Sequence, residues 1–184
     1  MSAITSVLRA SVGVDGVRRM ADDAKVACEA LPHGSPFLPL AMFLGAAAAY
    51  LMGDRDAAVQ GLAQAEQLAA SGATRVQTLC LAQLALLDVE GGDWEHAARS
   101  LRRARSLQRS HTLEEYSNQG IVFAMSALVA AHAKDAASSR GEARHARRLL
   151  SLNRGFAAWL IAECGIVSRV PRFCSANRPP PAPC

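Results

Sequence analysis

The residues of this sequence that could do acid–base chemistry are two pairs of adjacent carboxylates. These pairs are Asp22-Asp23 and Glu114-Glu115. Neighbouring residues of a helix point about 100° apart and do not face each other, so the members of a pair cannot share a proton. We therefore interpret both pairs as parts of solvated helix faces.

No other arrangement of reactive side chains indicates catalysis. The histidines lack the spacing of metal ligands, such as two histidines four residues apart; they are His33, His96, His111, His132 and His145. No CxxC pair, GxSxG nucleophile turn or GxxxxGK[ST] phosphate loop occurs. The sequence predicts a protein that is not an enzyme and that uses no metal and no cofactor.

Two groups of arginines could bind phosphates or an acidic partner. The first is Arg99, Arg102, Arg103, Arg105 and Arg109, and the second is Arg140, Arg144, Arg147 and Arg148. The first group lies opposite an apolar stripe of one expected helix, which is typical of a solvated face, and no aromatic residues interleave for base stacking. We retain as candidate contacts Arg99, Arg102, Arg103, Arg109, Arg144, Arg147 and Arg148.

The positive charge of the chain is concentrated near its C-terminal end. Residues 1–135 carry 12 Lys+Arg against 14 Asp+Glu, a net charge of −2, whereas residues 136–184 carry 8 against 2, a net charge of +6. The near-neutral body argues against a domain-wide nucleic-acid interface.

The composition favours an all-α fold. Hydrophobic residues make up 51% of the chain and aromatic residues only 5%, and alanine, the best helix former, supplies much of the apolar share. The five cysteines are widely spaced, which indicates a reducing, cytoplasmic location. Two of them, Cys28 and Cys80, are expected to pack as small hydrophobes. The longest apolar run, 37–52, is shorter than the roughly 20 residues that span a bilayer, so a soluble protein without membrane contact is expected.

A repeat of about 39 residues organises the sequence. Shifting the chain by 39 aligns Gly53-Asp54 with Gly92-Asp93 and, after these pairs, aligns alanines and leucines at helical spacing. A weaker copy follows at a shift of 42, with Asp135 in the place of Asp93 and with Ala143, Ala146 and Leu149 at the apolar positions. Asp15 lies 39 residues before Asp54, so the first copy is expected to be half a hairpin.

The repeat predicts antiparallel helical hairpins. In each Gly-Asp pair, glycine provides the left-handed end of one helix and aspartate caps the start of the next. Trp94 is expected to fill the joint between hairpins, and Trp159 to pack in the last helix rather than contact a ligand. The expected helices are 15–31, 37–52, 55–71, 74–90, 94–109, 113–133, 136–151 and 155–167.

The second helix of each hairpin resembles the tetratricopeptide pattern. In this pattern a glycine is followed by alanine at +5, a large apolar residue at +9 and alanine at +12; the fitting sets are Gly53, Ala58, Leu62, Ala65 and Gly92, Ala97, Leu101, Ala104. The period exceeds the usual repeat of about 34 residues. The resemblance therefore implies a right-handed solenoid of degenerate tetratricopeptide-like repeats.

A more specific likeness covers about residues 7–166. The segments 8–11, 15–21, 34–36 and 52–58 resemble the helical-repeat region of LuxR-type, MalT-like bacterial transcription regulators. The resemblance implies repeats that sense an effector or a partner. In that family an ATPase domain precedes the repeats and a helix-turn-helix domain follows them, and neither is found here, so a truncated regulator is expected.

These observations give a division into an N-terminal segment, 1–14, a repeat domain, 15–167, and a Pro-rich tail expected to be disordered, 168–184. In tetratricopeptide arrays the first helix of each hairpin lines the concave side. Here those helices, 37–52 and 74–90, are almost entirely apolar, so we expect other domains or self-association to bury them. A protein partner or small effector is expected on the concave face. The alternatives are non-specific nucleic-acid binding through the arginine faces and a non-functional gene remnant.

Overall fold

The fold is all-α, with eight α-helices in the part of the chain that the structure describes. This computed structural model describes residues 2–152 and 159–160. The helices are α1 (Ala3–Val12), α2 (Val17–Ala30), α3 (Leu38–Leu51), α4 (Arg55–Ala69), α5 (Thr74–Glu90), α6 (Trp94–Ser110), α7 (Gly120–His132) and α8 (Ala136–Leu152), and a single 3-10 turn, η1 (Ser117–Gln119), precedes α7.

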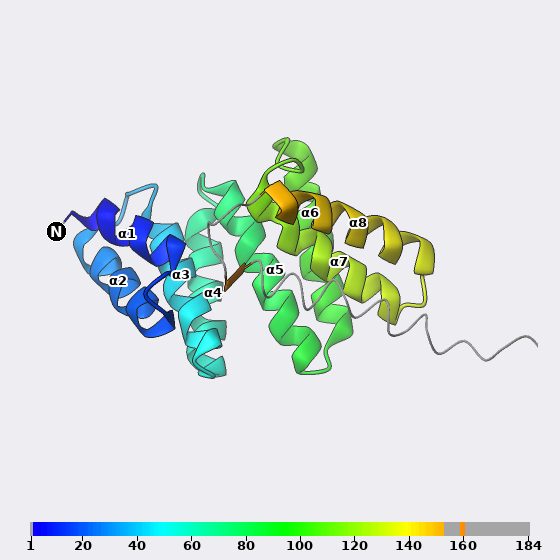
Figure 1. Ribbon diagram of the computed structural model, residues 1–184, viewed down its shortest axis with the longest axis horizontal. Coiled ribbons are helices and arrows are strands. Elements are labelled where there is room, and N and C mark those ends of the chain that lie inside the picture. The colour runs from blue at the N-terminus through cyan, green and yellow to red at the C-terminus, as the bar shows by residue number, and fades with distance from the viewer. Residues whose placement is uncertain (1, 153–158, 161–184) are drawn as a thin grey trace, which may run out of the picture.

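The helices pack mostly against their neighbours in the sequence, and they follow one another along the long axis of the molecule (Figure 1). Short turns join most consecutive helices, as in helical hairpins, whereas α6 and α7 are joined by residues 111–119, which include η1. No helix among the described residues is long and apolar enough to cross a membrane.

The Gly-Asp turns have the predicted conformation. Gly53 and Gly92 lie in the left-handed region, with φ of 87° and 85°. The Asp54 carboxylate accepts a hydrogen bond from the N–H of Ala57 (3.1 Å), and the Asp93 carboxylate accepts one from the N–H of His96 (2.9 Å). Residues of the turn therefore provide hydrogen-bond partners for backbone groups at the end of one helix and at the start of the next.

The third copy of the turn keeps the aspartate but replaces the glycine. The Asp135 carboxylate accepts a hydrogen bond from the N–H of Ser138 (3.0 Å), while Lys134 takes the left-handed conformation with φ of 62°. The weaker third repeat is thus a structural repeat as well.

The apolar stripe shared by the repeats is buried in all three copies. Ala58, Leu62 and Ala65 of α4 have no exposed surface. The residues at the same repeat positions of the other two helices are at most 3% exposed; they are Ala97, Leu101 and Ala104 of α6 and, at the shift of 42, Ser139, Ala143 and Ala146 of α8. This confirms the repeat as a pattern of burial.

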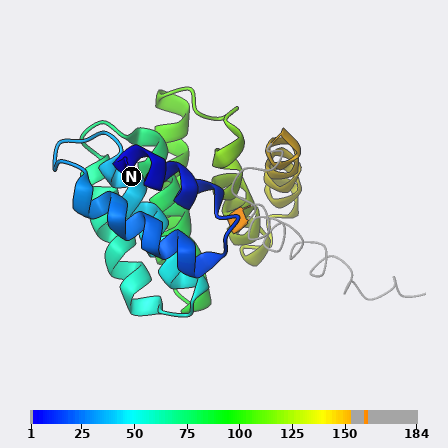
Figure 2. The ribbon, with the colours of Figure 1, turned by 60° about the vertical axis from the view of Figure 1, so that its left-hand side comes forward.

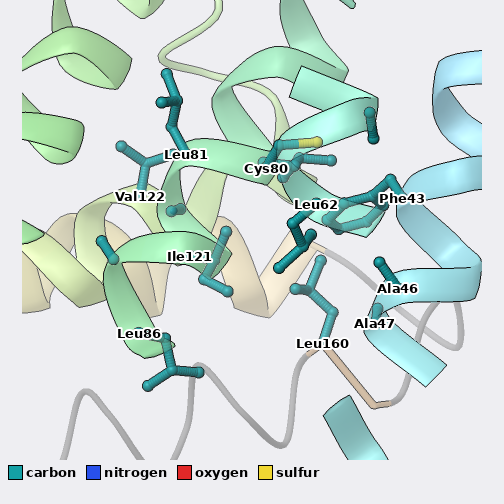
Figure 3. Packing of buried hydrophobic residues seen from close by; sticks show 14 of the residues in the cluster. Phe43, Ala46, Ala47, Leu62, Cys80, Leu81, Leu86, Ile121, Val122 and Leu160 are labelled. Carbon is teal, nitrogen blue, oxygen red and sulfur yellow. The ribbon is translucent and has the colours of Figure 1, made fainter. Parts of the chain in front are cut away.

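The helices α3, α5 and α7 are apolar on nearly all sides because other helices of the same chain surround them. α3 contacts α2 and α4, and α5 contacts α4, α6 and α7. Figure 3 shows side chains of these helices, among them Phe43, Leu81 and Ile121, gathered in one cluster. The chain's own helices therefore provide burial that we had expected from other domains or self-association.

The expectation that the chain opens on half a hairpin is wrong. Residues 3–12 form α1, which packs on α2 and buries Val7 and Ala10. Asp15 does not cap α2; Gly16 stands at the N-cap position with φ of 89° and no side chain to contribute.

The helix expected over 113–133 begins later, at Gly120. Two residues after α6, Thr112 takes the left-handed conformation with φ of 53°, and the N–H of Leu113 bonds to the carbonyl of Gln108 (2.8 Å). The following residues include Ser117 and Asn118, whose side chains favour turns over helix interiors. The helix expected at 155–167 and the tail at 168–184 lie outside the described residues, except for Trp159 and Leu160, which are helical.

Candidate functional site

Three of the candidate arginines are paired with carboxylates. Arg99 lies 2.6 Å from Glu95, and Arg103 lies 2.8 Å from Glu66. Both Nη atoms of Arg148 donate to Glu115 at 2.7 Å, and this hydrogen bond lowers the pKa of the Glu115 carboxyl. These three side chains are therefore partly neutralised before any partner arrives.

The other four candidate arginines are exposed on α6 and α8. Among the residues that the structure describes, they form no ion pair; they are Arg102, Arg109, Arg144 and Arg147. They leave a positive charge on the surface that could attract phosphates non-specifically.

Arg105, expected on the solvated face, points inward instead. Its side chain is 19% exposed, and its guanidinium lies 3.4 Å from Glu114, 3.5 Å from Glu142 and 4.1 Å above the ring of Phe123. Arg105 therefore joins α6 to α8 and to the segment before α7, which is a structural role.

A buried polar cluster next to Arg105 was not predicted. Gln119 accepts hydrogen bonds from the Thr78 hydroxyl (2.6 Å) and the Gln108 amide (3.1 Å), and donates to the carbonyl of Arg75 (3.2 Å). All three side chains are buried. Amides and a hydroxyl without a general base do not make a nucleophile, so we assign this cluster to fixing the joint between α5, α6 and η1.

Aromatic stacking completes the joint between hairpins. Trp94 stacks on His132 with ring centroids 3.7 Å apart, and His145 stacks on Phe123 at 3.9 Å. The expected position of Trp94 at a joint is confirmed, because its stacking joins α6 to α7, whereas the Phe123–His145 pair joins α7 to α8.

The two described cysteines are not poised as nucleophiles. Burial raises the pKa of the Cys80 thiol, and the nearby Glu66 carboxylate raises it further. Burial, followed by the charge of Glu29, raises the pKa of Cys28. Since the thiolate is the reactive form, both residues act as small hydrophobes, as expected.

The structure contains a cavity that no sequence pattern indicated. It has a volume of about 230 Å³ and lies between α1, α3 and α5. Its apolar wall is formed by Phe43, Leu44, Val76, Leu79, Trp159 and Leu160. An apolar cavity with a few polar groups is typical of small-molecule sites.

The chain's own Trp159-Leu160 pair forms one part of the wall of this cavity. The Trp159 ring lies 6.2 Å from that of Phe43, and Leu160, 3% exposed, packs in the main core. Figure 2 shows the segment 159–160 beside the turn that follows α1, where a Cβ placed on Gly13 would lie 3.3 Å from the indole. Trp159 therefore packs against α1 and α3, in addition to lining the cavity.

Polar groups line the cavity at a few points. Arg75 is exposed, and its guanidinium lies 5.0 Å from the centre of the Tyr116 ring. Asn118 and Ser11 also line it; the Ser11 hydroxyl already donates to the carbonyl of Val7 (2.8 Å). The Nε1 of Trp159 is buried and has no hydrogen-bond partner among the described residues.

No protein family matches the sequence of this chain, and a comparison with curated proteins finds no relative. The structure itself therefore has to support any functional conclusion.

Proposed function

We propose that this chain is a helical-repeat recognition module that binds a small effector between α1, α3 and α5. The observation that carries this proposal is the cavity of about 230 Å³ and its apolar wall. The resemblance of the repeats to the sensor region of LuxR-type regulators supports the same function, since effector sensing is what that resemblance implies. We also propose that the hairpins form a degenerate tetratricopeptide-like solenoid.

The size of the cavity favours a small effector over a protein segment. Drug-sized ligands occupy roughly 300–1,000 Å³, whereas an engineered apolar cavity of about 150 Å³ holds a benzene molecule. The observed volume lies between these values. A protein partner on the same side of the array remains the rival occupant, and it would have to displace Trp159 and Leu160.

The experiment is a thermal-shift screen with small apolar compounds that carry anionic, neutral or cationic head groups. A ligand at 100 times its Kd stabilises the folded state by about 2.7 kcal/mol, which raises Tm measurably. Val76→Phe fills the cavity from α5, and Val59→Phe is the matched control on the exposed side of α4.

We expect at least one compound to raise the Tm of the natural chain and of Val59→Phe, but not that of Val76→Phe. The proposal fails if no compound raises Tm, or if Val76→Phe responds as strongly as the control.

Non-specific nucleic-acid binding is the second candidate function. It is supported by the exposed arginines of α6 and α8 that form no ion pair within the described residues.

A further inference from the structure

We infer that the ligand of this cavity is a small apolar molecule with a carboxylate head group. This inference rests on the proposed function and adds the chemical class of the effector.

The first argument is charge. The described residues that line the cavity include one cation, Arg75, and no carboxylate. Arg75 forms no ion pair among the described residues, and its guanidinium is held over Tyr116 by a cation–π contact. A guanidinium fixed in this way presents several N–H donors and a full positive charge to a ligand, which matches a carboxylate better than a neutral group.

The second argument is the supply of hydrogen-bond donors. The Trp159 indole can only donate, and its buried Nε1 has no acceptor within residues 2–152 and 159–160. Asn118, which also belongs to the lining, adds an amide group with two donors. Since a buried donor without an acceptor costs free energy, a ligand whose acceptor oxygens reach these donors is stabilised.

The third argument is the size and polarity of the remaining wall. Phe43, Leu44, Val76 and Leu79 offer only apolar surface. If about 150 Å³ holds the six carbons of benzene, the observed 230 Å³ holds on the order of nine or ten non-hydrogen atoms. A saturated carboxylate of about eight carbons therefore fits both the wall and the volume.

The test uses octanoate, with 1-octanol and octylammonium as neutral and cationic probes of the same chain length. The chain has two tryptophans, and Trp94→Phe leaves Trp159 as the only fluorescent one while it keeps a ring to stack on His132. Binding is followed by the fluorescence of Trp159 in this background.

We expect octanoate to bind ten- to a hundredfold more tightly than 1-octanol, because a hydrogen bond to a charged group contributes about 1.5–3 kcal/mol. Arg75→Gln should remove this advantage and leave 1-octanol binding unchanged. Arg75→Lys should restore part of it. Arg102→Gln, which removes an exposed arginine of α6 that forms no ion pair in the part of the chain the structure describes, is the matched control and should have no effect.

The inference is overturned if octanoate does not bind, if octylammonium or 1-octanol binds as tightly, or if Arg75→Gln leaves octanoate binding intact. In each of these cases the proposed function still stands if the thermal-shift screen finds another compound that Val76→Phe excludes. If that screen also fails, both proposals fall together. Circular dichroism of each variant confirms that the helices are retained.

Discussion

At the scale of single residues, three turns of the chain share one backbone conformation but differ in the residue that precedes the aspartate. The N–H groups of Asp54, Asp93 and Asp135 each bond to a carbonyl five residues earlier, at 2.9, 2.8 and 2.9 Å. The residue before each aspartate must then be left-handed, and this conformation favours glycine because a side chain there meets the backbone. Only the third turn uses a residue with a side chain, Lys134.

Lys134→Gly should therefore stabilise the protein. The substitution removes the strain of a side chain in the left-handed conformation. Glycine also has more conformational entropy in the unfolded chain, which offsets part of this effect. The net gain in the free energy of unfolding should be about 0.5–1 kcal/mol. Urea denaturation measures this gain. The reciprocal control is Gly53→Ala, at φ of 87°, which should lose stability; a loss in both variants would contradict the argument.

Asp135→Asn should change how stability depends on pH. Hydrogen bonds from the Ser138 hydroxyl and N–H lower the pKa of the Asp135 carboxyl in the folded state. Its ionised form therefore contributes stability that is present above about pH 4, the ordinary pKa of aspartate, and that is lost as the pH falls through the lower folded value.

The measurement is Tm of both proteins at pH 7, 5 and 3. Asparagine also caps helices but carries no charge to interact with the helix dipole. The natural chain should be the more stable at pH 7, and its advantage should shrink by pH 3. A constant difference would show that the charge of Asp135 contributes nothing.

At the scale of the helices, the close approach of α3 and α4 depends on one glycine. A Cβ placed on Gly61 would lie 2.9 Å from the Cβ of Ala46, which is attached directly to the backbone and cannot turn away. Gly141 of α8, by contrast, faces open space.

Gly61→Ala and Gly141→Ala should therefore have opposite effects. Alanine in a helix gains about 0.5–1 kcal/mol over glycine, but overpacking a core contact costs about 1–3 kcal/mol. We expect Gly141→Ala to stabilise and Gly61→Ala to destabilise by up to about 2 kcal/mol in chemical denaturation. Stabilisation by Gly61→Ala would mean that α3 and α4 do not pack this closely.

The amphipathic helices could be predicted from the sequence, and the reason is visible in their burial. In α4, α6 and α8 most apolar residues recur at helical spacing, and those at the central repeat positions face inward. α1 gave no such signal: its Ile4 and Leu8 are 48% and 57% exposed, while Ser6 and Ser11 are buried. A pattern of hydrophobicity misreads a helix whose buried face holds serines.

The candidate site was predictable only in part. The sequence predicted the two helices that carry the arginines. It could not show that Arg105, unlike its neighbours, points inward, because this position depends on Glu114 and Glu142 from later segments. The cavity needs contact between Phe43 and Trp159. No local periodicity reports such a contact, since it depends on how the whole array brings distant helices together.

At the scale of the whole molecule, surface charge decides how the chain meets nucleic acid. Several arginines of α6 and α8 remain exposed, while Arg99, Arg103 and Arg148 are paired with carboxylates. We expect weak DNA binding that ignores sequence and falls steeply with salt, because it would depend on phosphate contacts.

Fluorescence anisotropy with two duplexes of equal length and scrambled sequence, each at low and near-physiological salt, checks this expectation. Replacing Arg144 and Arg147 with glutamate should weaken binding to both duplexes equally. A preference for one duplex that survives near-physiological salt would favour a nucleic-acid function over effector binding.

The contact between Trp159 and Phe43 also bears on the order of folding. Most helix contacts join sequential neighbours, and such local contacts form early because little chain entropy is lost in closing them. The contact between residues 43 and 159 instead closes a loop that runs through most of the array, so we expect it to form late and to open early on warming. Helix formation and completion of the cavity are then separate kinetic events, and a newly synthesised chain becomes helical before it can hold a ligand.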